Sequence, residues 1–331
     1  MQRWGFTYPL DAVPIAAHRE VLQQAESLGY TDAWTAEVDQ LDGFVPIAPA
    51  ALWTERMRFG TAIANVFIRG PALLAQQAAA VAEVAPGRFV LGVGASSPAI
   101  IENWNGMEMR RPLERVRETV AFLRQVFAGE RAANETLGVR GFRLGRRFAD
   151  PPPIFIAALR KKMLELAGSE GDGVIINWLG PDDVPKVVSV AREAATRAGR
   201  GADAFEVVCR IFVIPTDNDA IVQAVARRAI AGYMTTPVYS GFQRWLGRGE
   251  ALAPMQEAWA AGDRQQATAL VPEQVIEDLF VTGDRNACLD KIESYVKNGV
   301  TVPVLSFLPA VLDFKELGKR NMELIKELAP R

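Results

Sequence analysis

The sequence predicts an α/β protein with one (β/α)8 barrel, the TIM-barrel architecture, over residues 1–331. Eight apolar segments of strand length alternate with helical segments. Segments such as FVLGVG, IFIAA and GVIIN are almost wholly apolar, which is typical of parallel strands buried on both faces. No linker rich in Gly, Ser or Pro divides the chain. A doubly wound open sheet is the alternative, but it would rarely need eight repeats.

The first half of the chain alternates strands and helices in regular order. Strands are predicted over residues 4–8, 33–37, 58–65 and 89–94, and helices over 14–28, 44–54, 71–84 and 112–127. Gly29 and Gly129 end two of these helices, and Pro71 stands at the first position of a third, where its missing N–H is tolerated. An Arg-rich excursion over residues 130–148 follows, and we expect a hairpin around its segment GVRGFRLG.

The second half continues the alternation around one long insertion. Strands are predicted over residues 153–158, 173–178, 205–214 and 302–307, and helices over 161–168, 181–197, 284–297 and 311–328. Residues 218–282 are mostly helical in pattern, and we predict residues 233–282 as an insertion before the eighth strand. The aromatic residues of this insertion either wall a substrate site or pack: Tyr233, Tyr239, Phe242, Trp245 and Trp259.

Composition excludes several classes of partner. The net charge is −2, so the chain has no basic field for nucleic acid or an anionic membrane. No apolar run approaches the ~18 residues of a membrane helix, and the N-terminal residues follow a strand pattern rather than that of a signal peptide. We therefore expect a cytoplasmic protein that acts on a small molecule.

The histidine and cysteine content argues against metal chemistry. His18 is the only histidine, so no His₃ or His₂Glu metal site can form, and we expect no metal centre. It occurs early in a polar helical segment, where we expect it to face solvent. Cys209 and Cys288 are isolated and should be reduced and packed as small apolar residues.

The carboxyl ends of the strands are the expected functional face, because a (β/α)8 barrel carries its active site there. Polar and small residues follow several of the predicted strands at these ends. They are Thr7, Tyr8, Glu37, Asp39, Asp42, Asn65, Ser96, Ser97, Arg160, Lys161, Lys162, Asn177 and Trp178.

Two of these strand ends suit an anion or a flat ring. The segment 92–97, GVGASS, resembles half a dinucleotide fingerprint, but a lone GxG fits a tight turn as well as a ligand contact. The segment 157–163, AALRKKM, runs from a strand into a helix N-terminus. Three cations there are unfavourable for the helix unless an anion binds. A solvated basic turn is the alternative.

Three acidic residues follow the second predicted strand. Glu37, Asp39 and Asp42 could act as general acid or base, or accept a hydrogen bond from a ring N–H. An ordinary acidic loop is the alternative reading of the same residues.

Taken together, six segments resemble the luciferase-like monooxygenase superfamily, in particular its coenzyme F420-dependent branch near methylenetetrahydromethanopterin reductase. They span nearly the whole chain in order. The segments are GYTDAWTAEVDQLDGF, RFGTAIANVFIRGPALLAQQAAAV, GRFVLGVGASS, ENWNGMEMRRPLERVRETVAFLRQVFAGE, PIFIAALRKKMLELAGSEGDGVIINW and TGDRNACLDKIESY.

The resemblance implies an F420-dependent oxidoreductase, often dimeric, in which the deazaflavin lies across the mouth of the barrel and carries a hydride at C5. It also implies a bulge in the third strand with a non-prolyl cis peptide, which maps by position to Ala62-Ile63. The cofactor-binding residues that it implies or that the strand ends suggest are Thr7, Ala62, Ile63, Asn65, Gly94, Ala95, Ser96, Ser97, Ala158, Leu159, Arg160, Lys161, Lys162, Met163, Asn177 and Trp178.

Departures from the family pattern limit the substrate. Sugar-phosphate dehydrogenases of this branch keep a histidine where this chain has Val38, and a glutamate where it has Ser97. The resemblance therefore favours a reductase or another F420-linked dehydrogenase with an unidentified organic substrate. Glu37 and Asp39 are the candidate proton donors. An FMN-dependent monooxygenase of the same fold and a non-enzymatic barrel are the alternatives.

Overall fold

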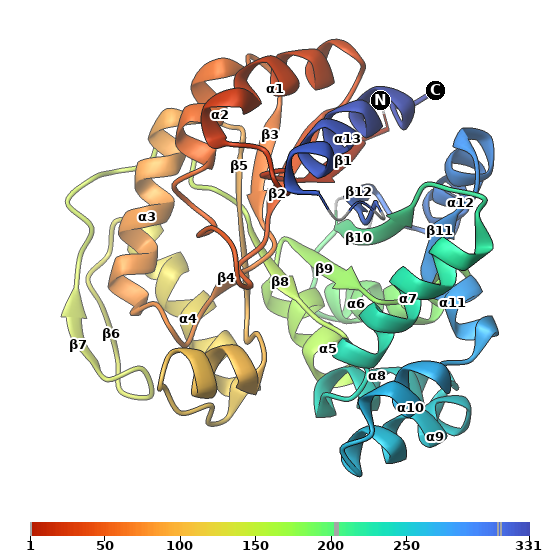
Figure 1. Ribbon diagram of the computed structural model, residues 1–331. Helices are drawn as coiled ribbons and strands as arrows, with labels where there is room; N and C mark the ends of the chain where they lie inside the picture. The colour runs from red at the N-terminus through yellow and green to blue at the C-terminus, as the bar shows by residue number, and fades with distance from the viewer. Residues whose placement is uncertain (1, 202–204, 310, 312) are drawn as a thin grey trace.

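The computed structural model describes residues 2–201, 205–309, 311 and 313–331, and it confirms the predicted (β/α)8 barrel (Figure 1). The barrel is closed because β1 pairs in parallel with both β2 and β12, and β10 pairs with both β9 and β12. Its strands are β1 Gly5–Thr7, β2 Asp32–Thr35, β3 Arg58–Thr61, β5 Phe89–Gly94, β8 Ile154–Ala157, β9 Gly173–Asn177, β10 Glu206–Ile214 and β12 Val302–Phe307. Most strand residues are buried, as their apolar sequences predict.

Helices surround the barrel close to the predicted positions. They are α1 His18–Ser27, α2 Ile47–Trp53, α3 Pro71–Val84, α4 Pro112–Phe127, α5 Lys161–Glu170, α6 Val184–Arg197, α12 Arg285–Lys297 and α13 Phe314–Glu327. Short helical turns precede three of them: η1 Ile15–Ala17, η2 Ala99–Trp104 and η3 Pro181–Asp183.

Two helices begin later than the sequence pattern suggests. The segment before α2 forms a turn instead, because the carboxylate of Asp42 accepts hydrogen bonds from the backbone N–H groups of Phe44 (2.7 Å) and Val45 (3.0 Å). For the last helix, the carboxylate of Asp313 accepts from the N–H groups of Lys315 and Glu316 and fixes the start of α13. Part of the prediction before α13, at residue 312, lies outside the described residues.

The predicted third strand is interrupted. After β3, pairing with β5 resumes only at β4, Ala64–Asn65. The register runs from Gly60 opposite Val90 to Ala64 opposite Val93, so four steps on one strand match three on the other. One extra residue is therefore accommodated, which is a β-bulge. The peptide bond between Ala62 and Ile63 within it is cis, as the resemblance implied.

The region before the eighth strand is a helical layer beside the barrel (Figure 1). Its elements are α7 Asp219–Tyr233, α8 Pro237–Leu246, α9 Gly249–Ala260, α10 Arg264–Ala269, α11 Glu273–Leu279 and β11 Phe280–Thr282. A second apolar cluster joins α7 to α9, α10 and α11, so the packing extends the layer back beyond Tyr233. The strand β11, which has no counterpart in the predicted elements, extends the sheet beside β10.

The Arg-rich excursion contains the expected hairpin, but its turn comes earlier than expected. Strand β6, Ala132–Asn134, pairs antiparallel with β7, Val139–Phe142. The turn falls before Val139 because the Asn134 side chain accepts from the Leu137 N–H at 2.9 Å, and Gly138 adopts a positive φ of 69°.

The expectation for His18 is wrong, because its side chain is completely buried. Its Nε2 accepts a hydrogen bond from the N–H of Leu10 at 2.9 Å, so Nδ1 carries the proton and donates to the carbonyl oxygen of Pro14 at 3.0 Å. The ring also meets Tyr8 edge-on at 5.1 Å. Helical periodicity cannot reveal this role, since the partners belong to the loop that precedes the helix.

Candidate functional site

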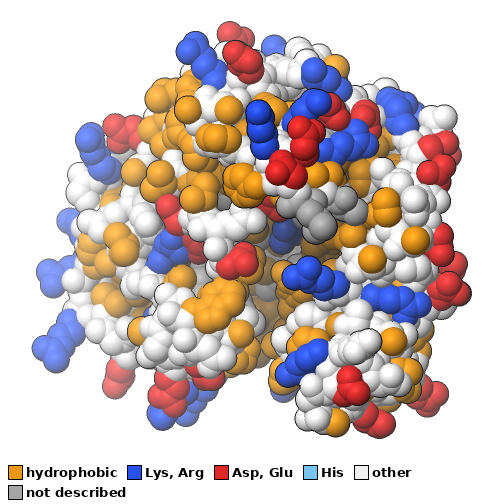
Figure 2. Space-filling view, in the orientation of Figure 1, with side chains coloured by type: hydrophobic (Ala, Val, Ile, Leu, Met, Phe, Trp, Pro, Cys, Tyr) orange, Lys and Arg blue, Asp and Glu red, His pale blue; other side chains and the backbone are white. Residues whose placement is uncertain are grey.

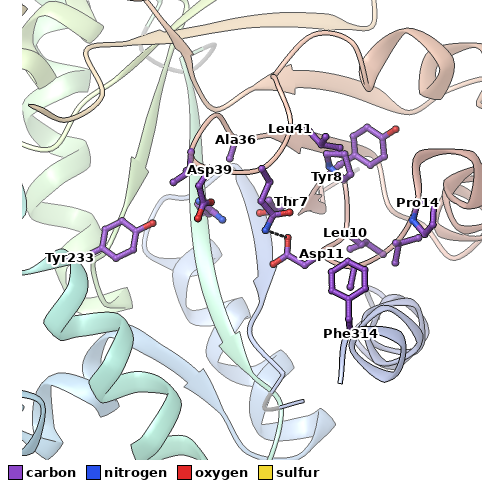
Figure 3. A pocket seen from close by; sticks show the side chains of 16 residues that line it. Thr7, Tyr8, Leu10, Asp11, Pro14, Ala36, Asp39, Leu41, Tyr233 and Phe314 are labelled. Atoms are coloured by element: carbon purple, nitrogen blue, oxygen red, sulfur yellow. Dashed lines mark hydrogen bonds between the residues drawn. The ribbon is translucent and has the colours of Figure 1, made fainter. Parts of the chain in front are cut away.

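A pocket of about 420 Å³ opens at the carboxyl ends of the strands (Figure 3). The loop after β1 and the loop after β2 form two of its walls, and α7 and α13 add Tyr233 and Phe314. Figure 2 shows the molecule hollowed between the barrel and the helical layer on this face. Apart from the tyrosines, the polar side chains on its wall are those of Thr7, Asp11, Asp39, Gln40 and Arg210.

A second, much smaller cavity of about 10 Å³ lies below the pocket, among the barrel strands. Thr7, Ala36 and Arg210 line both spaces, so the two are neighbours. Three buried polar atoms of its lining have no hydrogen-bond partner: Oγ1 of Thr7, Nε1 of Trp34 and Nε of Arg210. Buried donors normally find a partner, so their convergence indicates a place for an acceptor.

Arg210 is the cation of this region. It stands in the middle of β10, where Nη2 donates to the hydroxyl of Ser306 at 3.0 Å and the guanidinium lies 5.3 Å from the ring centre of Phe212. No carboxylate lies within 4.0 Å of it among the described residues. A charged residue inside the otherwise apolar segment VVCRIFVI was the sequence signal that could have identified it.

Asp11 and Asp39 supply two carboxylates to the same pocket. Gln40 donates a hydrogen bond to Oδ1 of Asp11 at 2.9 Å (Figure 3). Desolvation in the pocket raises the pKa of Asp11 above its ordinary value and the negative charge of Asp39 adds to the rise, whereas Gln40 and Arg210 act against it. The sequence analysis identified Asp39 but missed Asp11, which lies in the loop after the first strand.

Glu37 does not line the pocket, and its carboxylate is fully engaged beside it. Oε1 accepts from the N–H of Gly43 at 2.8 Å, and Oε2 accepts from the N–H of Asn65 at 3.2 Å and from Arg69. These contacts tie the loop after β2 to the end of the bulge. They favour a positioning role for Glu37, and its role as a proton donor stays a prediction.

The bulge brings several predicted residues together. Asn65 is buried, its Oδ1 accepts from the N–H of Phe67 at 2.8 Å, and its Nδ2 has no partner. Ile63 packs closely against Gly94, where an added side-chain carbon would lie 3.1 Å from Ile63 and 3.0 Å from Ala157. A side chain at position 94 would therefore push the bulge away from its neighbours.

The two predicted anion-binding segments both lie at strand ends. Ala95, Ser96 and Ser97 are half-buried after β5, and Ser96 adopts a left-handed φ of 62°. Arg160, Lys161 and Lys162 are exposed at the start of α5, which has neither a side-chain cap nor an acidic residue in its first turn. No carboxylate of the described residues pairs with these three cations, so the cations and the first N–H groups of α5 together fit an anion.

The remaining residues of that region are less accessible. Ala158 is buried, and Leu159 and Met163 pack against the main core. Arg160 reaches the helical layer, since its Nη1 would lie 3.0 Å from a side-chain carbon added at Gly241. The end of α5 and the start of the layer thus share one surface.

Trp178 belongs to the second apolar cluster, and its place near the cofactor ring stays a prediction. Its indole is buried against Phe212, Tyr233 and Phe280, with ring centres 4.2, 4.7 and 5.8 Å away. Its backbone has a left-handed φ of 56°, rare for a bulky residue, at the turn that leads from β9 to η3. Its neighbour Asn177 is half-buried.

The insertion aromatics divide between the two expected roles. Tyr233 lines the pocket, whereas Phe242 is completely buried and Tyr239, Trp245 and Trp259 pack against the two cores. Within residues 2–201, 205–309, 311 and 313–331, no group of His, Cys, Asp and Glu could hold a metal ion. Across the same residues, no helix is both long and apolar enough to cross a membrane.

Comparison with known families identifies the class of protein. The profile of the family described as luciferase-like monooxygenase matches residues 5–302, so the chain belongs to this family. It is similar to a Mycobacterium tuberculosis protein provisionally named a coenzyme F420-dependent oxidoreductase, with 26% identity over 92% of each chain. It is also 27% identical to 5,10-methylenetetrahydromethanopterin reductase of Archaeoglobus fulgidus, over 98% of this chain and 99% of that one.

Solved structures agree on the fold. The coenzyme F420-dependent tetrahydromethanopterin reductase of Methanopyrus kandleri matches with a TM-score of 0.75 and 24% identity, over 98% of this chain and 97% of the other. This structural likeness shows the shared fold. The family profile and the relatives named as F420-dependent oxidoreductase and methylenetetrahydromethanopterin reductase confirm the resemblance predicted from the sequence, and the chain is an enzyme of the luciferase-like family.

Proposed function

We propose that this protein is an F420-dependent oxidoreductase that transfers a hydride between the deazaflavin C5 and a small organic substrate. Similarity to F420-dependent relatives along nearly the whole chain supports the proposal. The observation that carries it is the fit of the mouth to such a cofactor. Nδ2 of Asn65, at the end of β4, has no partner among the described residues. The helix α5, which follows β8, has no side-chain cap and begins beside three cations. Both strands pair with β5, so the two features lie on either side of it.

The residues present suggest how the cofactor would be held. The Ala62–Ile63 bulge and Asn65 would support the ring, and Gly94–Ser97 with Arg160–Met163 would bind the phosphate tail. Thr7 and Asp39 would lie on the substrate side, since both line the pocket. When bound, the deazaflavin supplies a carrier for one hydride, which holds both transferred electrons, while the protein orients the substrate and limits access of water.

The first test is a titration of the apo-protein with F420 and with FMN, followed by fluorescence quenching. We expect F420 to bind and FMN to bind much more weakly. Arg160→Glu should weaken F420 binding at least about tenfold, because it replaces a cation near the tail by an anion. Arg146→Glu, which changes an exposed arginine of the excursion, is the control. Preference for FMN would instead favour the monooxygenase alternative.

We also propose a homodimer. Exposed apolar side chains of Val45, Leu52 and Leu73 lie before α2, on α2 and on α3, and orange side chains gather over these helices in Figure 2. Such a surface suits a second copy of the chain. Light scattering of the purified protein checks the mass, and a monomer at micromolar concentration would contradict the proposal.

A further inference from the structure

The net charge of the pocket and its unpartnered hydrogen-bond donors indicate which chemical class of substrate the pocket accepts. Membership of the family does not indicate this class. The wall carries one cation, Arg210, and two carboxylates, Asp11 and Asp39. Its formal charge with all three ionised is therefore −1, which disfavours an anionic substrate. Phosphate or carboxylate groups beside the reacting carbon would meet these two carboxylates.

The unpartnered donors indicate where the reacting group lies. Oγ1 of Thr7 and Nε of Arg210 are both buried, both lack a hydrogen-bond partner, and both belong to residues that line the pocket and the cavity below it. The small cavity has room for about one oxygen atom of the size of a water. An uncharged carbonyl oxygen satisfies both donors at once and brings no charge.

We propose, on the basis of the proposed F420 function, that the substrate is an uncharged ketone or aldehyde. Its oxygen accepts hydrogen bonds from Arg210 and Thr7, and Asp11 is the proton donor. The guanidinium then faces the oxygen on which negative charge develops, as an oxyanion-stabilising group does. Asp11 lines the larger pocket that adjoins the small cavity, and Thr7 and Arg210 line both spaces. Its hydrogen bond from Gln40 fixes the side chain of Asp11 there.

The reaction balances with the cofactor alone. The carbonyl carbon gains a hydride with two electrons from the reduced deazaflavin, the C=O π bond breaks, and the oxygen takes a proton from Asp11. The product is an alcohol, and the deazaflavin, oxidised by two electrons through loss of the hydride, releases one proton to solvent. Asp11 then regains a proton from solvent.

The raised pKa of Asp11 agrees with this role. A carboxylic acid must be protonated to donate, and desolvation favours that form. The rate of carbonyl reduction should therefore fall as the pH rises through the pKa of Asp11. The other ionised groups of the pocket also act on the pKa of Asp11: Arg210 lowers it and Asp39 raises it.

The test uses the full-length protein with reduced F420 and two matched compounds, 2-pentanone and 4-oxopentanoate, which differ by a terminal carboxylate. A set of larger uncharged ketones and aldehydes extends the range. We expect the uncharged compounds to be preferred by about tenfold or more in kcat/KM. Preference for the keto acid would overturn the proposal. Failure to reduce any uncharged carbonyl compound would do the same, provided that F420 binds.

Three variants test the residues. Arg210→Met should lower kcat about a hundredfold or more, and Thr7→Val about tenfold by loss of one hydrogen bond. Asp11→Asn should lower kcat at least about a hundredfold and abolish the fall of the rate at high pH. Arg228→Met and Asp150→Asn, which change exposed residues outside the pocket, are the matched controls.

Measurements of F420 affinity and Tm distinguish a loss of catalysis from a loss of cofactor binding or of folding. If all three variants bind F420 and melt as the wild type does but reduce carbonyls equally well, the buried donors only hold a water and the proposal is wrong. If the wild type does not bind F420, the proposed function itself fails. A loss of rate with retained cofactor affinity and Tm supports the assignment.

Discussion

At the scale of single residues, buried polar groups hold the loops that surround the pocket. His18 is the clearest case, because its two ring nitrogens hold the backbone of Leu10 and Pro14. Burial lowers the pKa of His18 from its ordinary value of 6.5, since the charged form is poorly solvated there. Protonation would also remove the acceptor for the Leu10 N–H. The loop that lines the pocket thus depends on a neutral imidazole.

His18 should make the stability depend on pH. A histidine whose pKa is lowered in the folded state contributes stability that is present above its unfolded pKa and is lost as the pH falls through the window between the two values. We therefore expect the free energy of unfolding to decrease below about pH 6.5. Urea denaturation at several pH values measures this.

The control for this effect is His18→Phe. It keeps a ring but leaves the N–H of Leu10 buried without an acceptor, at a cost of about 1–3 kcal/mol. As His18 is the only histidine, the variant should also lose the step of stability that begins near pH 6.5. An unchanged step would mean that other groups cause it.

At the scale of elements, the bulge in the third strand depends on one close approach. Oγ1 of Thr61 donates to the carbonyl oxygen of Gly92 at 2.7 Å and accepts from its N–H at 2.9 Å. These two bonds replace the regular ladder across the bulge. A side-chain carbon at position 92 would lie 1.9 Å from the carbonyl oxygen of Thr61, so only glycine fits.

Gly92→Ala should therefore displace the bulge. We expect a lower Tm and at least about tenfold weaker F420 binding, because the added carbon meets backbone rather than a flexible side chain. Gly145→Ala is the matched control, since nothing lies within 4 Å of its added carbon. Wild-type F420 affinity in Gly92→Ala would show that the bulge does not support the cofactor.

At the scale of the whole molecule, the two ends of the barrel carry different kinds of charge. At the amino end, Arg58 reaches across from β3 to Asp32 at 2.6 Å and to Glu206 at 2.7 and 2.8 Å. Each of these charges has a partner, as expected for an end that serves stability. At the carboxyl end, Arg210 has no carboxylate partner within the part of the chain that the structure describes, and its Nε and Oγ1 of Thr7 have no hydrogen-bond partner there.

Asp32→Asn should destabilise the protein strongly. The side chain of Asp32 is completely buried, so its loss leaves the guanidinium of Arg58 only partly compensated, at a cost of about 3–5 kcal/mol. F420 affinity should not change, because the pair is at the far end of the barrel. Glu193→Gln, in an exposed pair with Arg197, should leave the unfolding midpoint unchanged. A small effect of Asp32→Asn in urea denaturation would contradict this account.

The sequence by itself determined the barrel and the position of its functional face. Apolar strand segments, glycines that end helices and the alternation of strands with helices are all local patterns. Parallel strands of one barrel place their carboxyl ends at the same side, irrespective of the side chains in the loops. The resemblance also located the cis peptide at Ala62-Ile63. Local patterns likewise placed α3, α4, β5 and β12 at their observed bounds.

Only the tertiary structure decided what each polar side chain does. His18 became a loop support, Glu37 a partner of Arg69, and Trp178 a core residue, because their partners come from other segments. Arg210 and Asp11 lie far apart in the sequence and meet only when β10 closes the barrel beside β12 and β1. The periodicity of a sequence segment predicts which of its own side chains are buried. The hydrogen-bond and ion-pair partners of those side chains depend on which other elements pack beside the segment in the folded protein.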